Sequence, residues 1–200
     1  MPIDDTRLIS NQSTGKLGQL LALGLDKLKA KVTLLEGPVE EPLQSSSIRI
    51  KKFAFFDELL KLLKFEVWQK YDIIIHAAAV SDYRLKKAFK TKIPSSLKAL
   101  TLTLTPTPKI INEIKKIDPK SFLVGFKLES RISPQRAVKA TRDLFTKAHC
   151  DLVVANSIQN KNYLGYIVNR EKNILSEAKS RKELVRNLLK ILQNLFKRTM

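Results

Sequence analysis

The feature that most constrains the fold is a regular alternation of helical and strand patterns along most of this 200-residue chain. Leucines recur at helical spacing within a helix expected from Gly15 to Ala30, and a strand pattern follows at Lys31–Glu36. Further strands are expected at 48–53, 71–80, 122–128 and 151–155, and further helices at 56–70, 109–116 and 134–149. This alternation predicts a parallel sheet covered by helices on both faces.

The remaining segments complete the predicted architecture. Leu100–Leu104 alternates threonine with leucine as a half-buried strand does, and the basic segment before it is expected to be irregular. Gly165–Leu175 predicts a hairpin that turns at Asn169–Lys172, and Ser180–Lys197 predicts a closing helix. We therefore expect a single α/β domain over residues 1–200. It would be a Rossmann-like three-layer sandwich with a mostly parallel sheet and a C-terminal β-hairpin plus helix.

The net charge is +18, from 37 Lys and Arg against 19 Asp and Glu. Such a surplus attracts polyanions, so phosphorylated substrates and nucleic acids both have to be considered. The basic residues are spread over nearly every expected helix, which favours solvated helix faces, and aromatic residues make up only 7% of the chain. We do not expect nucleic acid as a partner, and a basic nucleic-acid-binding protein stays the weaker alternative.

Cysteine content and hydropathy bear on the compartment. Cys150 is the single cysteine, which excludes an intrachain disulfide and a cysteine metal cluster. The apolar stretch Ile73–Val80 is far shorter than the roughly 20 residues that span a bilayer. The first residues, Met1–Asp5, are acidic where a secretory leader would be basic. We expect a cytoplasmic protein without a membrane partner.

A polar turn leads into the first expected helix. Ile9–Gly18 is rich in hydroxyl and amide side chains, with Asn11, Ser13 and Gly15 just before the helix. Free amide donors and the helix dipole at such a position favour an anion, so a phosphate or carboxylate is one interpretation and ordinary helix capping is the other. The spacing matches neither a Walker motif nor a GxGxxG fingerprint.

Small residues follow the central apolar strand. Ala77 and Ala78 let a ligand approach the backbone, and Asp82 comes just after the strand end. Asp82 is suited to a ribose hydroxyl or a magnesium ion, and a turn or helix-cap aspartate is the alternative. His76 lies within the strand, which favours a packed core histidine over a catalytic one.

Three further segments are candidates for the site. Lys90–Ser96 is a basic loop with hydroxyls, which is the composition of a mobile lid over a polyphosphate. Phe126 closes a strand and is expected either to wall a base pocket or to pack in the core. Asn156 is expected at the end of the strand that precedes it.

In their order and spacing these segments resemble the phosphopantothenoylcysteine synthetase family over nearly the whole chain. The matching stretches lie at 2–4, 9–18, 32–38, 77–83, 92–96, 102–110, 124–129 and 151–156. Lys92–Ser96 and Gly125–Glu129 look more like the stand-alone synthetases than like the halves fused to a decarboxylase.

The resemblance implies a ligase of coenzyme A synthesis. It implies that the carboxylate of 4′-phosphopantothenate first reacts with CTP or ATP, in the presence of Mg2+, and forms an acyl-nucleotide. The amine of L-cysteine then displaces the nucleotide and forms an amide. Asn11 matches the asparagine that orients the acyl intermediate, Lys92 the lid lysine on the phosphates, and Asp82 the aspartate that contacts the nucleotide. Ala77, Ala78 and Phe126 would border the base, and Ser13 and Gly15 would contact anions. Ile9–Asn11 tilts the expected nucleotide toward CTP, and a homodimer is expected.

The chain departs from the family pattern at one point. Family chains have a first strand and a glycine-threonine turn before the segment that here begins at Pro2–Asp4. Three explanations stay open: the true start lies upstream, the chain is a truncated homologue that binds without turnover, or another subunit supplies the strand.

Overall fold

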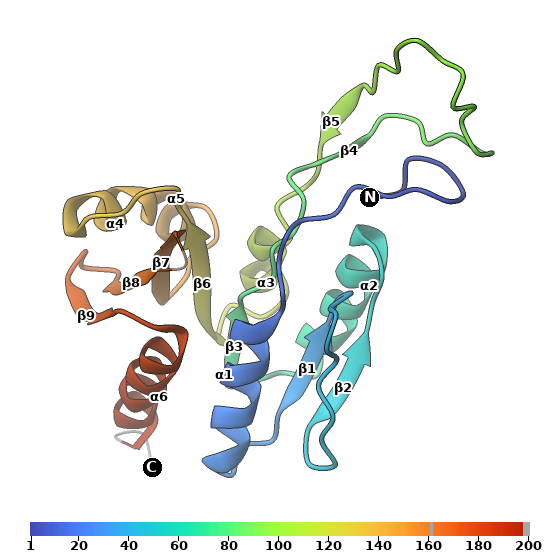
Figure 1. Cartoon of the computed structure of the whole chain (residues 1–200). Coiled ribbons are helices and arrows are strands. Elements are labelled where there is room, and N and C mark those ends of the chain that lie inside the picture. Colours follow the sequence, from blue (N-terminus) through green and yellow to red (C-terminus); the bar gives the residue numbers. More distant parts are fainter. Residues whose placement is uncertain (161, 198–200) are drawn as a thin grey trace.

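The computed structural model describes residues 1–160 and 162–197, and Figure 1 shows the arrangement of its elements. The strands of the first half are β1 (Thr33–Glu36), β2 (Arg49–Lys52), β3 (Ile73–His76), β4 (Tyr83–Leu85) and β5 (Leu104–Pro106). Those of the second half are β6 (Phe122–Leu128), β7 (Leu152–Gln159), β8 (Asn162–Asn169) and β9 (Ile174–Ala178). The helices are α1 (Lys16–Lys27), α2 (Phe56–Val67), α3 (Ile111–Ile117), α4 (Pro134–Ala140), α5 (Arg142–Thr146) and α6 (Arg181–Lys197).

The strands form three groups. The largest is a five-stranded sheet in the order β3-β6-β7-β8-β9, in which β3, β6 and β7 are parallel and the last two pairings are antiparallel. β1 and β2 form a separate parallel pair. β4 and β5 form an antiparallel arm that extends away from the five-stranded sheet, with the N-terminal segment beside it (Figure 1). Parallel central strands with crossover helices confirm the predicted α/β class.

Helices cover both faces of the five-stranded sheet. α1 packs on α6 on one face, and α2 packs on α3 on the other. Side chains of β6 alternate between these layers: Val124 joins the cluster with α1 and α6, and Leu123 joins the cluster with α2 and α3. Both side chains are fully buried, as expected for a strand between two helical layers. The predicted three-layer sandwich is therefore confirmed.

Several local predictions were wrong. The strand expected at Leu100–Leu104 begins only at Leu104, where β4 runs alongside it, and β4 itself lies in the segment expected to be irregular. The helix expected at 134–149 is two short helices that meet at the buried Thr141, whose hydroxyl bonds the Val138 carbonyl. β7 continues to Gln159 because β8 pairs with it along its whole length.

Candidate functional site

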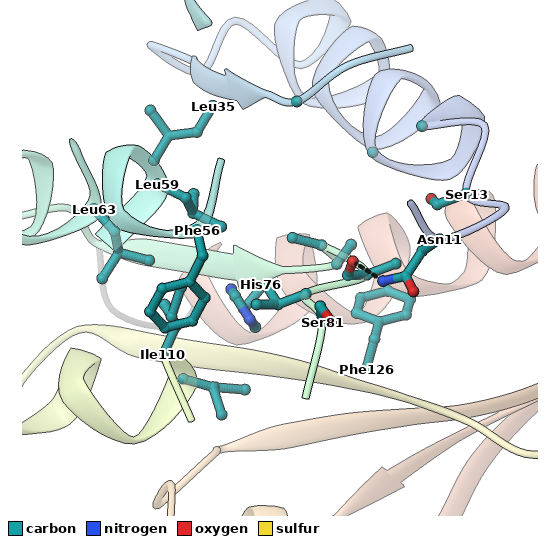
Figure 2. A pocket seen from close by; sticks show the side chains of 18 of the residues that line it. Asn11, Ser13, Leu35, Phe56, Leu59, Leu63, His76, Ser81, Ile110 and Phe126 are labelled. Atoms are coloured by element: carbon teal, nitrogen blue, oxygen red, sulfur yellow. Dashed lines mark hydrogen bonds between the residues drawn. The ribbon is translucent and has the colours of Figure 1, made fainter. Parts of the chain in front are cut away.

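A large cavity runs along β1 and β3 and continues past their carboxyl ends, where ligands of open α/β sheets bind. Its volume is about 2260 Å³. The loop before α1, the loop after β3, the end of β6 and the face of α2 all contribute to its lining (Figure 2). Seven of the eight predicted site residues line it: Asn11, Ser13, Gly15, Ala77, Ala78, Asp82 and Phe126.

Asn11 joins two of these loops. Its side-chain amide donates a hydrogen bond of 2.6 Å to the carbonyl oxygen of Ala79, 68 positions along the chain (Figure 2). The bond fixes the polar turn before α1 against the small-residue segment after β3. The Asn11 side chain itself is exposed, so its amide oxygen stays available to a ligand in the cavity.

The polar turn enters α1 through a glycine. Gly15 is the N-cap, with φ of +69°, and makes no side-chain capping bond. An added Cβ at Gly15 would lie 2.5 Å from a methyl carbon of Val39, so the turn requires glycine on two counts. The first turn of the 12-residue helix carries no acidic side chain. This arrangement leaves the amide donors of α1 to an anion and rules out side-chain capping at this position.

Asp82 is paired with a cation. Its carboxylate lies 2.5 Å from the ammonium group of Lys109, and both side chains are exposed. The loop is held by Thr107, whose amide donates to the Asp82 carbonyl at 2.9 Å and whose hydroxyl donates to the Ser81 carbonyl at 2.6 Å. No group of three or more possible metal ligands occurs within residues 1–160 and 162–197. A magnesium ion at Asp82 would therefore need further ligands, such as the oxygens of a bound phosphate.

Two groups in or near the cavity are held neutral. Desolvation lowers the pKa of His76 from 6.5 to about 4, so the imidazole is uncharged at neutral pH. Desolvation, with a smaller contribution from Asp151, raises the pKa of the Cys150 thiol to about 12. Cys150 is fully buried beside Gly125 and is not a nucleophile at neutral pH. Phe126 lines the cavity and also packs against the core, and its contact with a base stays a prediction.

Lys92 is the one predicted site residue outside the cavity lining. It is exposed in the segment between β4 and β5, and the next residue, Ile93, is buried. The Ile93 amide donates to the Asp4 carboxylate at 3.1 Å, and the Ile93 carbonyl accepts from Arg7 at 2.9 Å. The N-terminal loop therefore anchors the lid segment at Ile93.

The buried carboxylate of Asp4 is the centre of this anchor. It accepts hydrogen bonds from the amides of Ile93, Thr6 and Arg7 and from the Thr6 hydroxyl. The bond from Ile93, followed by those from Thr6 and Arg7, lowers the Asp4 pKa to about 2 despite an opposing effect of burial. The carboxylate is ionised at all physiological pH values.

Sequence reasoning missed the roles of Asp4, Arg7, Thr107 and Lys109. Asp4 carried one local signal, because an aspartate followed by threonine two residues later is typical of an Asx-turn. Lys109 lies 27 positions from its partner Asp82, and no pattern joins them. Asn156, a further candidate expected at a strand end, lies buried within β7 and lines the cavity.

Comparison with known proteins identifies relatives over nearly the whole chain. Residues 1–195 match the family described as the DNA/pantothenate metabolism flavoprotein C-terminal domain. The coenzyme A biosynthesis bifunctional protein CoaBC of Thermococcus kodakarensis is 38% identical over 159 residues, which cover 78% of this chain and 38% of that protein. The chain thus spans well under half of this curated relative.

Solved structures show the same fold. A DNA/pantothenate metabolism flavoprotein from Streptococcus pneumoniae superposes with a TM-score of 0.85 and 26% identity, covering 96% of this chain and 93% of that one. A Cab2 variant solved in complex with phosphopantothenate-cysteine has a TM-score of 0.74 at 17% identity, covering 100% of this chain and 85% of that one. Within the described residues, no helix is both long enough and apolar enough to cross a membrane.

Proposed function

Since the chain belongs to the DNA/pantothenate metabolism flavoprotein C-terminal domain family, we propose that it is a phosphopantothenoylcysteine synthetase, a ligase that joins 4′-phosphopantothenate to L-cysteine in coenzyme A synthesis. The resemblance predicted from the sequence motifs is thereby confirmed at the level of the family. The stand-alone type and the cytoplasmic location stay predictions.

The observation that carries the proposal is the Asn11–Ala79 contact at the mouth of the cavity. It brings an uncapped helix N-terminus, suited to a phosphate or carboxylate, against a backbone segment of small residues, suited to a nucleotide. A reaction between a carboxylate and a nucleoside triphosphate needs these two subsites side by side.

In the proposed first step, a carboxylate oxygen of 4′-phosphopantothenate attacks the α-phosphorus of the triphosphate. The bond from that phosphorus to the bridging oxygen breaks, and pyrophosphate leaves with the electron pair. The amide donors at the start of α1 would hold the acidic substrate, and Lys92, carried in by the lid segment, would neutralise the phosphates. Because Lys92 lies outside the cavity lining, this role requires the lid segment to move.

In the second step, the amine nitrogen of L-cysteine attacks the acyl carbon. The bond from that carbon to the nucleotide oxygen breaks, a nucleoside monophosphate leaves, and the ammonium proton passes to solvent. Asn11 would orient the acyl group, since its amide oxygen is free while its amide nitrogen is fixed on Ala79. Neutral His76 and the thiol of Cys150 have no proton-transfer role in this scheme.

The nucleotide and metal are part of the proposal. Ala77 and Ala78 present backbone groups and Phe126 presents a ring edge or face, which would border a base. We propose CTP, with ATP as the alternative. Mg2+ would arrive with the triphosphate and reduce its charge, and Asp82 would become a ligand only after separation from Lys109.

A homodimer is also proposed. The β4–β5 arm and its loop expose large apolar side chains that a second copy would cover. They are Tyr83, Phe89, Leu97, Leu100 and Leu104, each 42–53% exposed.

The test is pyrophosphate release by the full chain with 4′-phosphopantothenate, L-cysteine, Mg2+ and either CTP or ATP. Turnover that needs 4′-phosphopantothenate supports the ligase, and the faster nucleotide is the substrate.

Asn11→Asp and Lys92→Gln are expected to lower kcat/KM about 100-fold or more. Asn173→Asp on the β8–β9 turn and Lys120→Gln after α3 are matched controls with unchanged activity, since both side chains are exposed and neither lines the cavity.

One outcome would favour a different function. Tight binding of nucleotide or 4′-phosphopantothenate by calorimetry without any pyrophosphate release would mean that the chain binds without turnover. The separation of β1 from the main sheet favours this candidate, because the site then lies beside an incomplete sheet.

A further inference from the structure

A second group of polar side chains lines the cavity, apart from the residues around Asn11. It consists of Asn156 near the carboxyl end of β7, Tyr163 near the start of β8 and Arg181 at the start of α6. In the sheet order, β7 lies two strands away from β3. The cavity measures about 2260 Å³, whereas single ligand sites usually measure about 300–1,000 Å³, so it has room for a further subsite here.

The strand register places this group on the face of the sheet that α1 and α6 cover. Asn156 pairs with Gly165 of β8, and Tyr163 lies two residues before Gly165. Side chains two residues apart on a strand share a face, so Asn156 and Tyr163 lie on the same side. Leu17 of α1 and Ala77 after β3 pack in the same cluster as Tyr163. The group therefore belongs to the layer that contains both segments joined by Asn11.

The Tyr163 hydroxyl is buried without a partner. Tyr163 is 8% exposed, and its hydroxyl makes no hydrogen bond to any described residue. Buried tyrosine hydroxyls usually have a partner, because an unpaired one costs free energy. Burial raises the pKa of Tyr163 well above its ordinary value of 10.0, although Arg181 acts in the opposite direction. The hydroxyl keeps its proton at neutral pH and can donate it to a ligand.

A glycine keeps the space beside this hydroxyl open. A Cβ added at Gly165 would lie 3.2 Å from the Tyr163 hydroxyl oxygen and 3.5 Å from the Asn156 Cβ. A side chain at Gly165 would therefore fill the gap between the two polar groups. Asn156 is 7% exposed, and its side-chain amide has no hydrogen-bond partner in the described part of the chain.

Arg181 adds a cation that no carboxylate neutralises. Its guanidinium carbon lies 5.8 Å from the centre of the Tyr163 ring, and it has no ion pair within the described residues. The first turn of α6 is already capped, since the Glu183 amide donates to the Ser180 hydroxyl and the Glu183 carboxylate accepts from the Lys179 amide. The positive charge at this end of the cavity therefore comes from the Arg181 side chain.

The chemistry of the three groups fits a carboxylate. A guanidinium only donates hydrogen bonds, and its planar fork matches the two oxygens of a carboxylate. The Tyr163 hydroxyl and the Asn156 amide can each donate one more. A phosphate monoester carries about −1.5 to −2 charges at neutral pH, which one arginine does not balance. A singly charged carboxylate is the better match.

We propose that Asn156, Tyr163 and Arg181 bind the carboxylate of an amino acid and, resting on the proposed ligase function, that this amino acid is L-cysteine. The site lies in the same cavity as Asn11, whose side chain points into it in Figure 2. A carboxylate held by Arg181 leaves the amine of L-cysteine free to face the acyl group that Asn11 orients. These residues bind and position the amino acid, and they take no part in proton transfer.

The test measures binding by ligand-observed NMR with the full chain under reducing conditions. L-cysteine is compared with cysteamine, which has the same amine and thiol but lacks the carboxylate. We expect the unchanged protein to bind L-cysteine at least about 10-fold more tightly. Arg181→Gln should remove this preference. Lys182→Gln, which removes the same charge from an exposed neighbour outside the cavity lining, should keep it.

Tyr163→Phe separates a binding role from a structural one. The change removes one buried, unpaired hydroxyl, so the urea midpoint of the ligand-free protein should rise. The affinity for L-cysteine should fall about 3- to 10-fold in the same variant. A lower urea midpoint with unchanged affinity would show that the hydroxyl serves the fold, and would overturn its place in the subsite.

Three results would overturn the carboxylate assignment. One is an unchanged preference for L-cysteine over cysteamine in Arg181→Gln. Another is the absence of L-cysteine binding to the unchanged protein. The third is weaker binding of 4′-phosphopantothenate by Arg181→Gln with unchanged binding of L-cysteine, which would make the group a phosphate subsite. None of these measurements needs turnover. An inactive ligase that still bound L-cysteine through Arg181 would end the proposed function and leave the carboxylate site standing.

Discussion

The carboxylate of Asp4 accepts a hydrogen bond of 3.1 Å from the backbone amide of Ile93, 89 positions away in the chain. This bond, with that from Arg7 to the Ile93 carbonyl, ties the start of the chain to the residue beside Lys92. The position of the proposed lid lysine thus depends on a buried acidic side chain that does not itself line the cavity.

Asp4→Asn is expected to loosen the lid segment. Asparagine keeps only one of the two acceptor oxygens, so either the Ile93 amide or the amides of Thr6 and Arg7 lose their acceptor and face an NH2 group. Trypsin cleavage after Lys90, Lys92 or Lys98 should become about 10-fold faster under native conditions. Asp5→Asn, a change of the same charge at the exposed neighbouring residue, is the control. Equal cleavage rates for the two variants would show that Asp4 does not hold the segment.

The Asp4 carboxylate also makes the stability of the lid segment depend on pH in acid. Its pKa is about 2 in the folded protein and 3.8 as the ordinary value, so its contribution to stability is complete above pH 3.8 and is lost as pH falls toward 2. Trypsin does not work there, but pepsin cleavage of the 86–103 segment should accelerate over this range in the unchanged protein. In Asp4→Asn the cleavage rate should already be high at pH 4 and change less below it.

Two glycines in the same helix region give opposite expectations. Gly15→Ala should lower the free energy of unfolding by about 1–2 kcal/mol, because φ is +69° and the new methyl meets Val39 at 2.5 Å. Gly18→Ala has open space around its Cβ in a helix and should raise that free energy by about 0.5–1 kcal/mol. Urea unfolding measures both. A shift of the same sign in the two variants would contradict the conformation of the turn.

Local patterns predicted the parts of the fold that depend on local sequence. The segment Phe122–Leu128 is a strand with the expected bounds, and its apolar residues 122–126 are buried or half-buried between two helical layers. The start of α2 at Phe56 was also predicted. By contrast, β4 has only three residues, Tyr83–Leu85, and is a strand because β5 pairs with it, so no local pattern could reveal it.

The site divides in the same way. Residues that follow strands, such as Ala77 and Asp82, were predictable because the ends of parallel strands meet at one edge. The partners that fix them were not, since the Asp82–Lys109 pair and the Asp4–Ile93 bond join distant segments through side chains.

His76 predicts a pH dependence of stability. Its pKa is about 4 in the folded protein against 6.5 ordinarily, so between these values the unfolded chain binds a proton that the folded chain excludes. The free energy of unfolding is therefore complete above pH 6.5 and falls by up to about 3 kcal/mol as pH is lowered to 4. His76→Gln should remove this slope in urea unfolding at several pH values, whereas His149→Asn, at the exposed second histidine, should keep it. If the unchanged protein and both variants lose the same free energy of unfolding as pH falls, the loss arises from carboxylates and not from His76.

The proposed dimer predicts a defect confined to the arm. Leu97 and Leu100 are exposed by 52% and 43% in the loop between β4 and β5, where a partner would bury them. The double change Leu97→Glu and Leu100→Glu places two desolvated charges in that interface, so the dissociation constant from sedimentation velocity should rise at least about 100-fold. Leu28→Glu, at a side chain 40% exposed beyond the end of α1, is the matched control and should leave the dimer intact. An unchanged dissociation constant in the double variant would move the interface away from the arm, and a protein that is monomeric at every concentration would end the dimer proposal.

Because the arm also carries Lys92, a weakened dimer that lost triphosphate-dependent turnover would connect assembly to the position of the lid.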